Sequence, residues 1–92
     1  MKHLITYALL ALSLSAVPGH AACFVEYKAK QDNPLRLHYG IIKVGGDCSD
    51  ADAKATSRLQ SNGWSLLAIL SASQEKPSRN KQENAGANYL RY

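Results

Sequence analysis

The two cysteines of this 92-residue chain, Cys23 and Cys48, constrain its fold more than any other feature. A bridge between them would close a loop of about 25 residues, which contributes on the order of 3 kcal/mol in the chain-entropy description of disulfides. That contribution matters because small domains bury little apolar surface and commonly need a covalent cross-link to be stable. The spacing therefore predicts a small fold in which these two positions meet.

The N-terminal segment has the three-part layout of a secretory signal peptide. Lys2 and His3 give it a positively charged start, residues 4–17 are mostly apolar, and Pro18 and Gly19 end that run before two alanines. The apolar run is shorter than the roughly 18 residues needed to span a bilayer. The segment therefore predicts export, to the periplasm or outside the cell, with no transmembrane segment after cleavage.

The residues at the end of this segment predict where it is cut. Small side chains at Gly19 and Ala21 favour a cut directly after the second of them. We therefore expect a cleaved signal of residues 1–21 and a single small domain of residues 22–92.

Three chemical states of Cys23 are compatible with this cleavage. A bacterial lipoprotein would carry a leucine-like residue where His20 stands, so a lipid on Cys23 is the less favoured alternative. Free thiols are the third state. Because an oxidising compartment favours pairing of the only two cysteines, we expect a disulfide between Cys23 and Cys48.

Apolar and polar residues alternate in two segments that follow the signal. Residues 24–30 and 35–44 are predicted to be strands, and the turn-forming sequence QDNP at residues 31–34 separates them. In an antiparallel hairpin the start of the first strand lies beside the end of the second. The hairpin would therefore bring Cys23 close to Cys48.

The alternation in the second predicted strand slips at Ile41 and Ile42, next to Gly40. A β-bulge inserts one extra residue and shifts the faces of the residues that follow. We therefore expect a bulge at this position.

A helix is predicted after Cys48, and Gly63 is placed to end it. Its apolar stripe is made mainly of small residues, which let a helix lie close to a sheet. The stripe consists of Ala51, Ala55 and Leu59.

The remaining chain completes the predicted fold. Residues 64–71 are apolar on both faces, which is typical of a central strand. Residues 71–86 contain Pro77 and no periodicity, so we expect a long exposed loop, followed by a last strand at 87–92. The order β-β-α-β-β predicts a two-layer α+β domain with about four mainly antiparallel strands and one helix.

Charge and motifs exclude several classes of function. Lys2 leaves with the signal, so the 11 Lys and Arg become 10 against 7 Asp and Glu, a net charge of +3. That mild basic excess suits an anionic envelope polymer and is too small to indicate nucleic-acid binding. The chain has no CxxC, no cluster with metal-ligand spacing, no P-loop and no GxGxxG. We therefore expect no cofactor and no metal.

The strongest catalytic hypothesis centres on His38, the one histidine outside the signal. Glu26, with Arg36 or Lys28, could face it across the hairpin and form an acid/base site of a small hydrolase. A solvated histidine on a strand is the competing interpretation, because nothing in the sequence holds a partner beside the imidazole. The sequence therefore favours a protein that is not an enzyme.

A binding surface is the alternative that the apolar pattern supports. Leu67 and Ile69 lie on the side of the predicted central strand that one helix would leave uncovered. A second copy or a protein partner could cover them. Lys76, Arg79 and Lys81 add positive charge nearby. These five residues form the predicted binding site of an exported, non-enzymatic binding or envelope-associated protein.

A third hypothesis is inhibition of a secreted enzyme. The polar residues 74–84 would then enter the cleft of that enzyme as an exposed loop.

Two segments resemble known sequences. RLQSNGWSLLAILS, residues 58–71, resembles short bacterial domains of unknown function in which a helix ends at Gly-Trp before an apolar strand. YKAKQDNPLRLHYG, residues 27–40, and NAGANYLRY, residues 84–92, resemble an uncharacterised family of small exported bacterial proteins. That resemblance implies export and carries no established activity or residue role.

Overall fold

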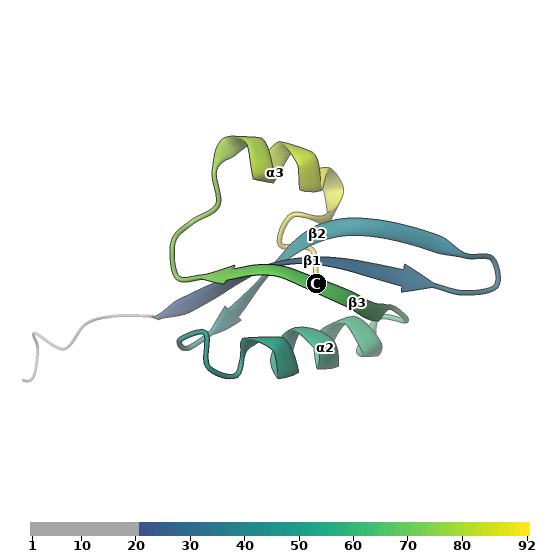
Figure 1. The fold of residues 1–92 in the computed structure, drawn as a ribbon, viewed down its shortest axis with the longest axis horizontal. Helices are drawn as coiled ribbons and strands as arrows, with labels where there is room; N and C mark the ends of the chain where they lie inside the picture. The colour runs from purple at the N-terminus through teal and green to yellow at the C-terminus, as the bar shows by residue number, and fades with distance from the viewer. Residues whose placement is uncertain (1–20) are drawn as a thin grey trace, which may run out of the picture.

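A three-stranded antiparallel sheet separates two α-helices in the computed structural model, which describes residues 21–92 (Figure 1). The signal-peptide prediction for residues 1–21 lies, except for its last residue, outside the described residues. No helix in the described part is long and apolar enough to cross a membrane. The elements are β1 (Ala22–Gln31), β2 (Arg36–Gly45), α2 (Ala51–Ser61), β3 (Ser65–Ser73), α3 (Arg79–Ala85) and the 3₁₀-helix η1 (Gly86–Asn88).

The predicted hairpin is confirmed. β1 pairs with β2 without interruption along ten residues of each strand, and residues 32–35 form the turn between them. Because the strands are antiparallel, the start of β1 lies beside the end of β2, where Cys23 is opposite Val44. Cys48 follows shortly after, and the predicted disulfide between Cys23 and Cys48 is present.

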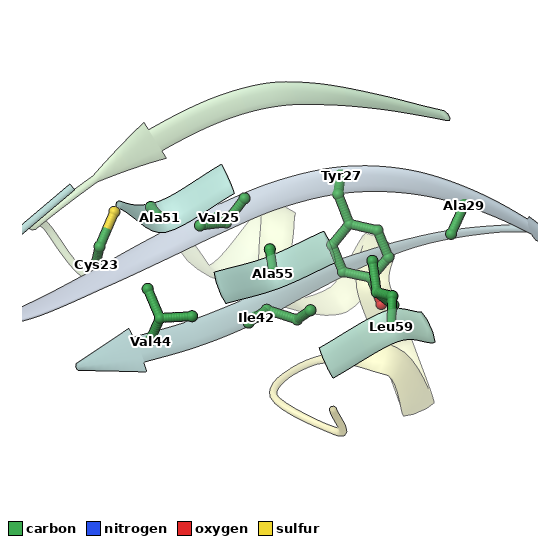
Figure 2. Packing of buried hydrophobic residues seen from close by; sticks show 9 residues of the cluster. All are labelled: Cys23, Val25, Tyr27, Ala29, Ile42, Val44, Ala51, Ala55 and Leu59. Carbon is green, nitrogen blue, oxygen red and sulfur yellow. The ribbon is translucent and has the colours of Figure 1, made fainter. Parts of the chain in front are cut away.

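One face of the sheet packs against α2 to form the hydrophobic core (Figure 2). The helix contributes the predicted stripe, and the small alanines let it lie close to the strands. The buried cluster consists of Cys23, Val25, Tyr27, Ala29, Ile42, Val44, Ala51, Ala55 and Leu59.

The predicted bulge in β2 is wrong, because the register of β1 and β2 is continuous there. Ile41 and Ile42 are adjacent and both buried, at 1% and 0% exposed, although they point to opposite faces. Ile42 joins the core under α2. On the other face Ile41 lines the hollow under α3, and the C-terminal segment runs along the free edge of β2, where Leu90 N donates a hydrogen bond of 2.8 Å to Ile41 O. Two consecutive apolar residues therefore mark a position covered on both sides.

Tyr27 and Gly40 are paired across the hairpin, and the Tyr27 side chain lies over the glycine. A Cβ added at Gly40 would be 2.5 Å from the Tyr27 hydroxyl oxygen and 2.8 Å from Cζ. Glycine is therefore required here to make room for a fully buried aromatic ring.

The helix α2 ends at Gly63 as predicted. The glycine has a φ of 82°, a left-handed conformation that glycine adopts without steric cost. Trp64 N donates to Leu59 O at 2.9 Å, and Gly63 N donates to Gln60 O at 3.1 Å. This pair of bonds is the Schellman motif, which turns the chain from the helix into β3.

β3 is an edge strand of the sheet and not the central strand that its apolar sequence suggested, because the strand order is β2-β1-β3. Two register shifts against β1 leave Leu67 and Leu70 without a paired residue. As a result Leu66 and Ile69, three residues apart, both pack against the core. Bulges of this kind break the period of two, and simple alternation therefore misassigned the faces of β3.

The long loop predicted for residues 71–86 and the strand predicted for residues 87–92 are both wrong. Part of the first segment forms α3, whose N-cap Ser78 accepts a hydrogen bond from Lys81 N at 3.3 Å. The second segment forms the end of η1 and then an irregular tail, with a single bridge from Tyr89 to Ile41. Within residues 21–92 the α+β class is confirmed, with three strands and two α-helices in place of four strands and one.

The disulfide should hold a large share of the folding stability. We expect the paired substitutions Cys23→Ala and Cys48→Ala to lower the free energy of unfolding by about 3 kcal/mol, since they release a loop of 25 residues. Urea titration followed by circular dichroism measures the difference. The reduced wild-type chain serves as the control and should match the variant; a variant as stable as the oxidised chain would contradict the prediction.

Replacing Gly40 should cost more than replacing another glycine of β2. Gly40→Ala forces the added methyl group against the Tyr27 ring, and we expect a loss of about 1–3 kcal/mol in urea titration. Gly45→Ala is the matched control, because nothing lies within 4 Å of its Cβ position. Equal losses of unfolding free energy for the two variants would show that the packing of the Tyr27 ring does not depend on the missing side chain at Gly40.

Candidate functional site

The predicted catalytic trio is not brought together. His38 is paired with Ala29 on the face that α2 covers, whereas Glu26 is paired with Ile41 on the opposite face. Arg36 lines a surface cleft together with His38, on the same side as α2. The imidazole of His38 therefore has the Arg36 guanidinium near it, whereas the Glu26 carboxylate is on the other side of the sheet. His38 and Glu26 cannot act as an acid/base pair in this arrangement.

His38 is held by aromatic side chains from three parts of the chain. Its Nε2 is hydrogen-bonded to the Tyr27 hydroxyl at 2.8 Å. The Trp64 ring meets the imidazole edge-on with centroids 4.2 Å apart, and the Tyr92 ring stacks on it at 5.6 Å. The other nitrogen, Nδ1, is buried and has no hydrogen-bond partner among the described residues. Neither nitrogen is therefore free to exchange a proton with a substrate.

The surroundings of His38 favour its neutral form. Burial lowers the pKa of the imidazole below its ordinary value of 6.5, and the positive charge of Arg91 lowers it further. Burial also raises the pKa of the Tyr27 hydroxyl well above 10.0. Both partners of the hydrogen bond are therefore uncharged at neutral pH, as their position beside the core requires.

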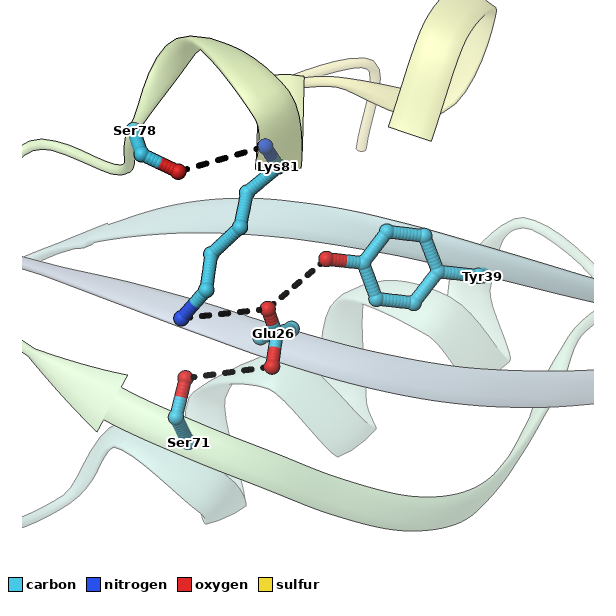
Figure 3. Close-up of polar contacts among 5 residues, drawn as sticks. All are labelled: Glu26, Tyr39, Ser71, Ser78 and Lys81. Carbon is cyan, nitrogen blue, oxygen red and sulfur yellow. Dashed lines mark hydrogen bonds and ion pairs between the residues drawn. The ribbon is translucent and has the colours of Figure 1, made fainter. Parts of the chain in front are cut away.

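Glu26 is the centre of a polar cluster on the opposite face, beneath α3 (Figure 3). The Tyr39 hydroxyl donates to Glu26 Oε2 at 2.7 Å, and Lys81 Nζ from α3 lies 3.4 Å from the same oxygen. The Ser71 hydroxyl donates to Oε1 at 3.5 Å. The Glu26 side chain is only 14% exposed. Because its partners come from β2, β3 and α3, these contacts join the helix to all three strands.

Tyr39 is a permanent donor in this cluster. Its burial, together with the hydrogen bond to Glu26, raises the pKa of the Tyr39 hydroxyl to about 12. The phenol therefore stays protonated at physiological pH and keeps one carboxylate oxygen occupied. Glu26 is an anchor for the helix and lacks the free oxygen that a general base would need.

The three basic residues of the predicted binding site have different surroundings. Lys81 points to the sheet and pairs with Glu26. Lys76 and Lys81 line the hollow between α3 and the sheet together with Glu75 and Glu26, so the two positive and two negative charges there are balanced. Arg79 is exposed at the start of α3. The proposed inhibitory segment 74–84 is likewise partly helical and docked on the sheet.

The two apolar residues of that predicted site lie on different faces. Ile69 packs against the core under α2. Leu67 is 52% exposed and lines a hollow with Leu37, which is 65% exposed, and with Tyr39 and Lys28. We call these four residues, Lys28, Leu37, Tyr39 and Leu67, the open patch.

The open patch is uncovered because the helix on its face is short. That helix is α3, whose seven residues are roughly 10 Å long, whereas a ten-residue strand is roughly 33 Å long. One short helix therefore cannot cover the whole hairpin. Leu35 and Leu37, near the turn, lie at the end that no helix covers, and both are more than 60% exposed, at 64% and 65%.

Comparisons of the chain with protein-family models, with curated proteins and with solved structures find no significant match. Inference about function therefore starts from the side chains of this chain alone.

Stability should depend on pH through His38. Because its pKa is lower in the folded chain than the ordinary 6.5, the unfolded chain binds a proton first as the pH falls. The contribution is fully present above about pH 7 and is lost as the pH falls through about 6.5 towards the folded pKa. Urea titrations across this range should show the loss in the wild-type chain and a flatter profile for His38→Gln.

The ring protons of His38 give an independent check. An NMR titration of the folded chain should yield a pKa below 6.5 for the imidazole. A value at or above 6.5 would remove the physical basis of this prediction.

Proposed function

We propose that this chain is an exported, non-enzymatic binding protein that acts as a dimer, joined through the open patch. The dimer is formed by two copies related by a two-fold axis, each covering the patch of the other. The observation that carries the proposal is the pair of half-exposed leucines, Leu37 on β2 and Leu67 on β3, which line one hollow across β1 on an uncovered part of the sheet.

Apolar exposure of this kind favours association. Large leucines that line one hollow lose their unfavourable contact with water only when a second surface covers them, and each fully buried leucine contributes roughly 1.5–3 kcal/mol. α3 covers the part of this face around Ile41 and Glu26 and leaves the open patch free. The described chain supplies no further segment to cover it.

A second copy is the favoured partner. Two-fold dimers are the commonest assemblies, and they place the same patch of each copy against the other. Tyr39 and Lys28 form the polar rim of the patch. Lys30, the next lysine on this face of β1, already pairs with Asp32 at 3.4 Å. A single lysine from each copy at the rim leaves little repulsion to oppose the leucine contacts.

Export is supported by the disulfide. The bond between Cys23 and Cys48 is at the edge of the core, and such bonds persist in oxidising compartments outside the cytosol. The leader-like residues 1–21 agree with this location. The periplasm of a bacterium is the compartment that we propose.

A binding role is also supported by the state of the titratable groups. Both nitrogens of His38 are engaged or buried, and both oxygens of Glu26 accept hydrogen bonds. A hydrolase centred on either residue would need a free proton acceptor, so the geometry favours binding over catalysis.

The test is the native mass of the folded protein. We expect a dimer for the wild-type chain and a monomer for Leu67→Lys, measured by light scattering after size-exclusion chromatography. Each copy of the variant would bring a charge into the apolar centre of the interface, which opposes association.

Leu35→Lys is the matched control. Leu35 is as exposed as Leu37, lies in the turn of the hairpin outside the open patch, and is exchanged for the same residue. The control variant should remain a dimer. A monomeric wild-type chain, or a Leu67→Lys variant that still forms dimers, would refute the proposal.

A further inference from the structure

A cleft on the α2 side of the molecule lies between three segments that are far apart in the sequence. Arg36 and His38 come from β2, Asn62 and Trp64 from the corner between α2 and β3, and Asn88 and Arg91 from the C-terminal segment. Its volume of about 530 Å³ falls within the range of roughly 300–1,000 Å³ that is common for small-molecule sites.

The charge of this cleft is unbalanced. Arg36 and Arg91 both line it, together with Tyr92, and no Asp or Glu side chain does. Neither arginine forms an ion pair with any residue of the described part, residues 21–92. Arg91 is held in place beside the Tyr92 ring, 5.4 Å from its centroid. Two unpaired guanidinium groups in one cleft favour an anionic ligand, and their planar donor pairs match the oxygens of a carboxylate.

The uncharged residues of the cleft indicate which chemical groups the ligand carries besides its carboxylate. Asn62 uses its amide nitrogen on Arg58 O at 2.8 Å, which leaves its carbonyl oxygen as an acceptor. Asn88 adds a second amide, with both a donor and an acceptor. Hydroxyl groups, which donate and accept, are the natural partners of such amides. Trp64, half-buried beside them, presents an aromatic surface against which the C–H face of a sugar ring can pack.

We infer that this cleft binds an acidic sugar, with the carboxylate between Arg36 and Arg91 and the ring hydroxyls on Asn62 and Asn88. The inference goes beyond the proposed dimer, because none of these four residues belongs to the open patch, although His38 lines both hollows. The ligand inferred here, an acidic sugar, is of the kind found in anionic envelope polymers. Loss of sugar binding with an intact dimer, or the reverse, would identify which of the two ideas has failed.

The experiment uses three probes that separate charge from ring. D-glucuronate carries both, D-glucose carries the ring alone, and acetate carries the carboxylate alone. Binding is followed by NMR shifts of the Trp64 indole and the His38 ring in the wild-type protein. We expect saturable shifts with D-glucuronate and at least tenfold weaker binding of the other two probes, since each lacks one set of contacts.

Substitutions then test the arginines. Arg36→Gln and Arg91→Gln should each weaken binding of D-glucuronate by roughly tenfold or more, because each removes a charge-assisted contact. Arg79→Gln, an exposed arginine on α3 outside the cleft, is the charge-matched control and should bind like the wild-type chain. The circular dichroism spectrum verifies that every variant is folded.

Three outcomes would overturn the inference. Absence of any shift with D-glucuronate would mean that the cleft holds no such ligand. Acetate bound as tightly as D-glucuronate would mean a site for small anions with no role for the ring. Equal weakening by Arg79→Gln and Arg91→Gln would mean a general effect of net charge.

Discussion

The packing of Tyr27 on Gly40 is the contact on which most of the remaining structure depends. A fully buried aromatic ring in the middle of β1 needs space on the neighbouring strand, and glycine provides it. The hydroxyl of the same ring reaches His38 and fixes the imidazole between Trp64 and Tyr92. One cross-strand pair therefore places the corner after α2 and the C-terminal segment as well as the core.

Features that depend on neighbouring residues could be predicted from the sequence. The hairpin, the pairing of Cys23 with Cys48 and the end of α2 at Gly63 each have a local signal, in alternation, cysteine count or glycine placement. α3 has signals only at its ends, the N-cap Ser78 and the glycine after Ala85, and it lacks an apolar stripe because Ala85 is its one buried residue. Its main tie to the sheet is the distant pair of Lys81 and Glu26, which no apolar period could reveal.

The candidate sites were harder to predict because they depend on register and on tertiary contacts. The turn pairs Gln31 with Arg36, so His38 is opposite Ala29, and Glu26 must point to the other face. A turn one residue longer or shorter would have changed that assignment. The cleft beside His38 includes residues from the C-terminal segment, whose position follows from the whole fold and from no nearby pattern.

The two bulges of β3 have a consequence for how the chain behaves among many copies of itself. Its nine residues carry no charge and form a sheet edge, the kind of strand that can recruit further strands into open-ended fibrils. Leu67 and Leu70 interrupt the regular pairing pattern twice along this edge. A strand from another copy therefore cannot pair regularly with this edge. The bulges oppose edge-to-edge association here, a role that charged side chains usually have on an exposed edge strand.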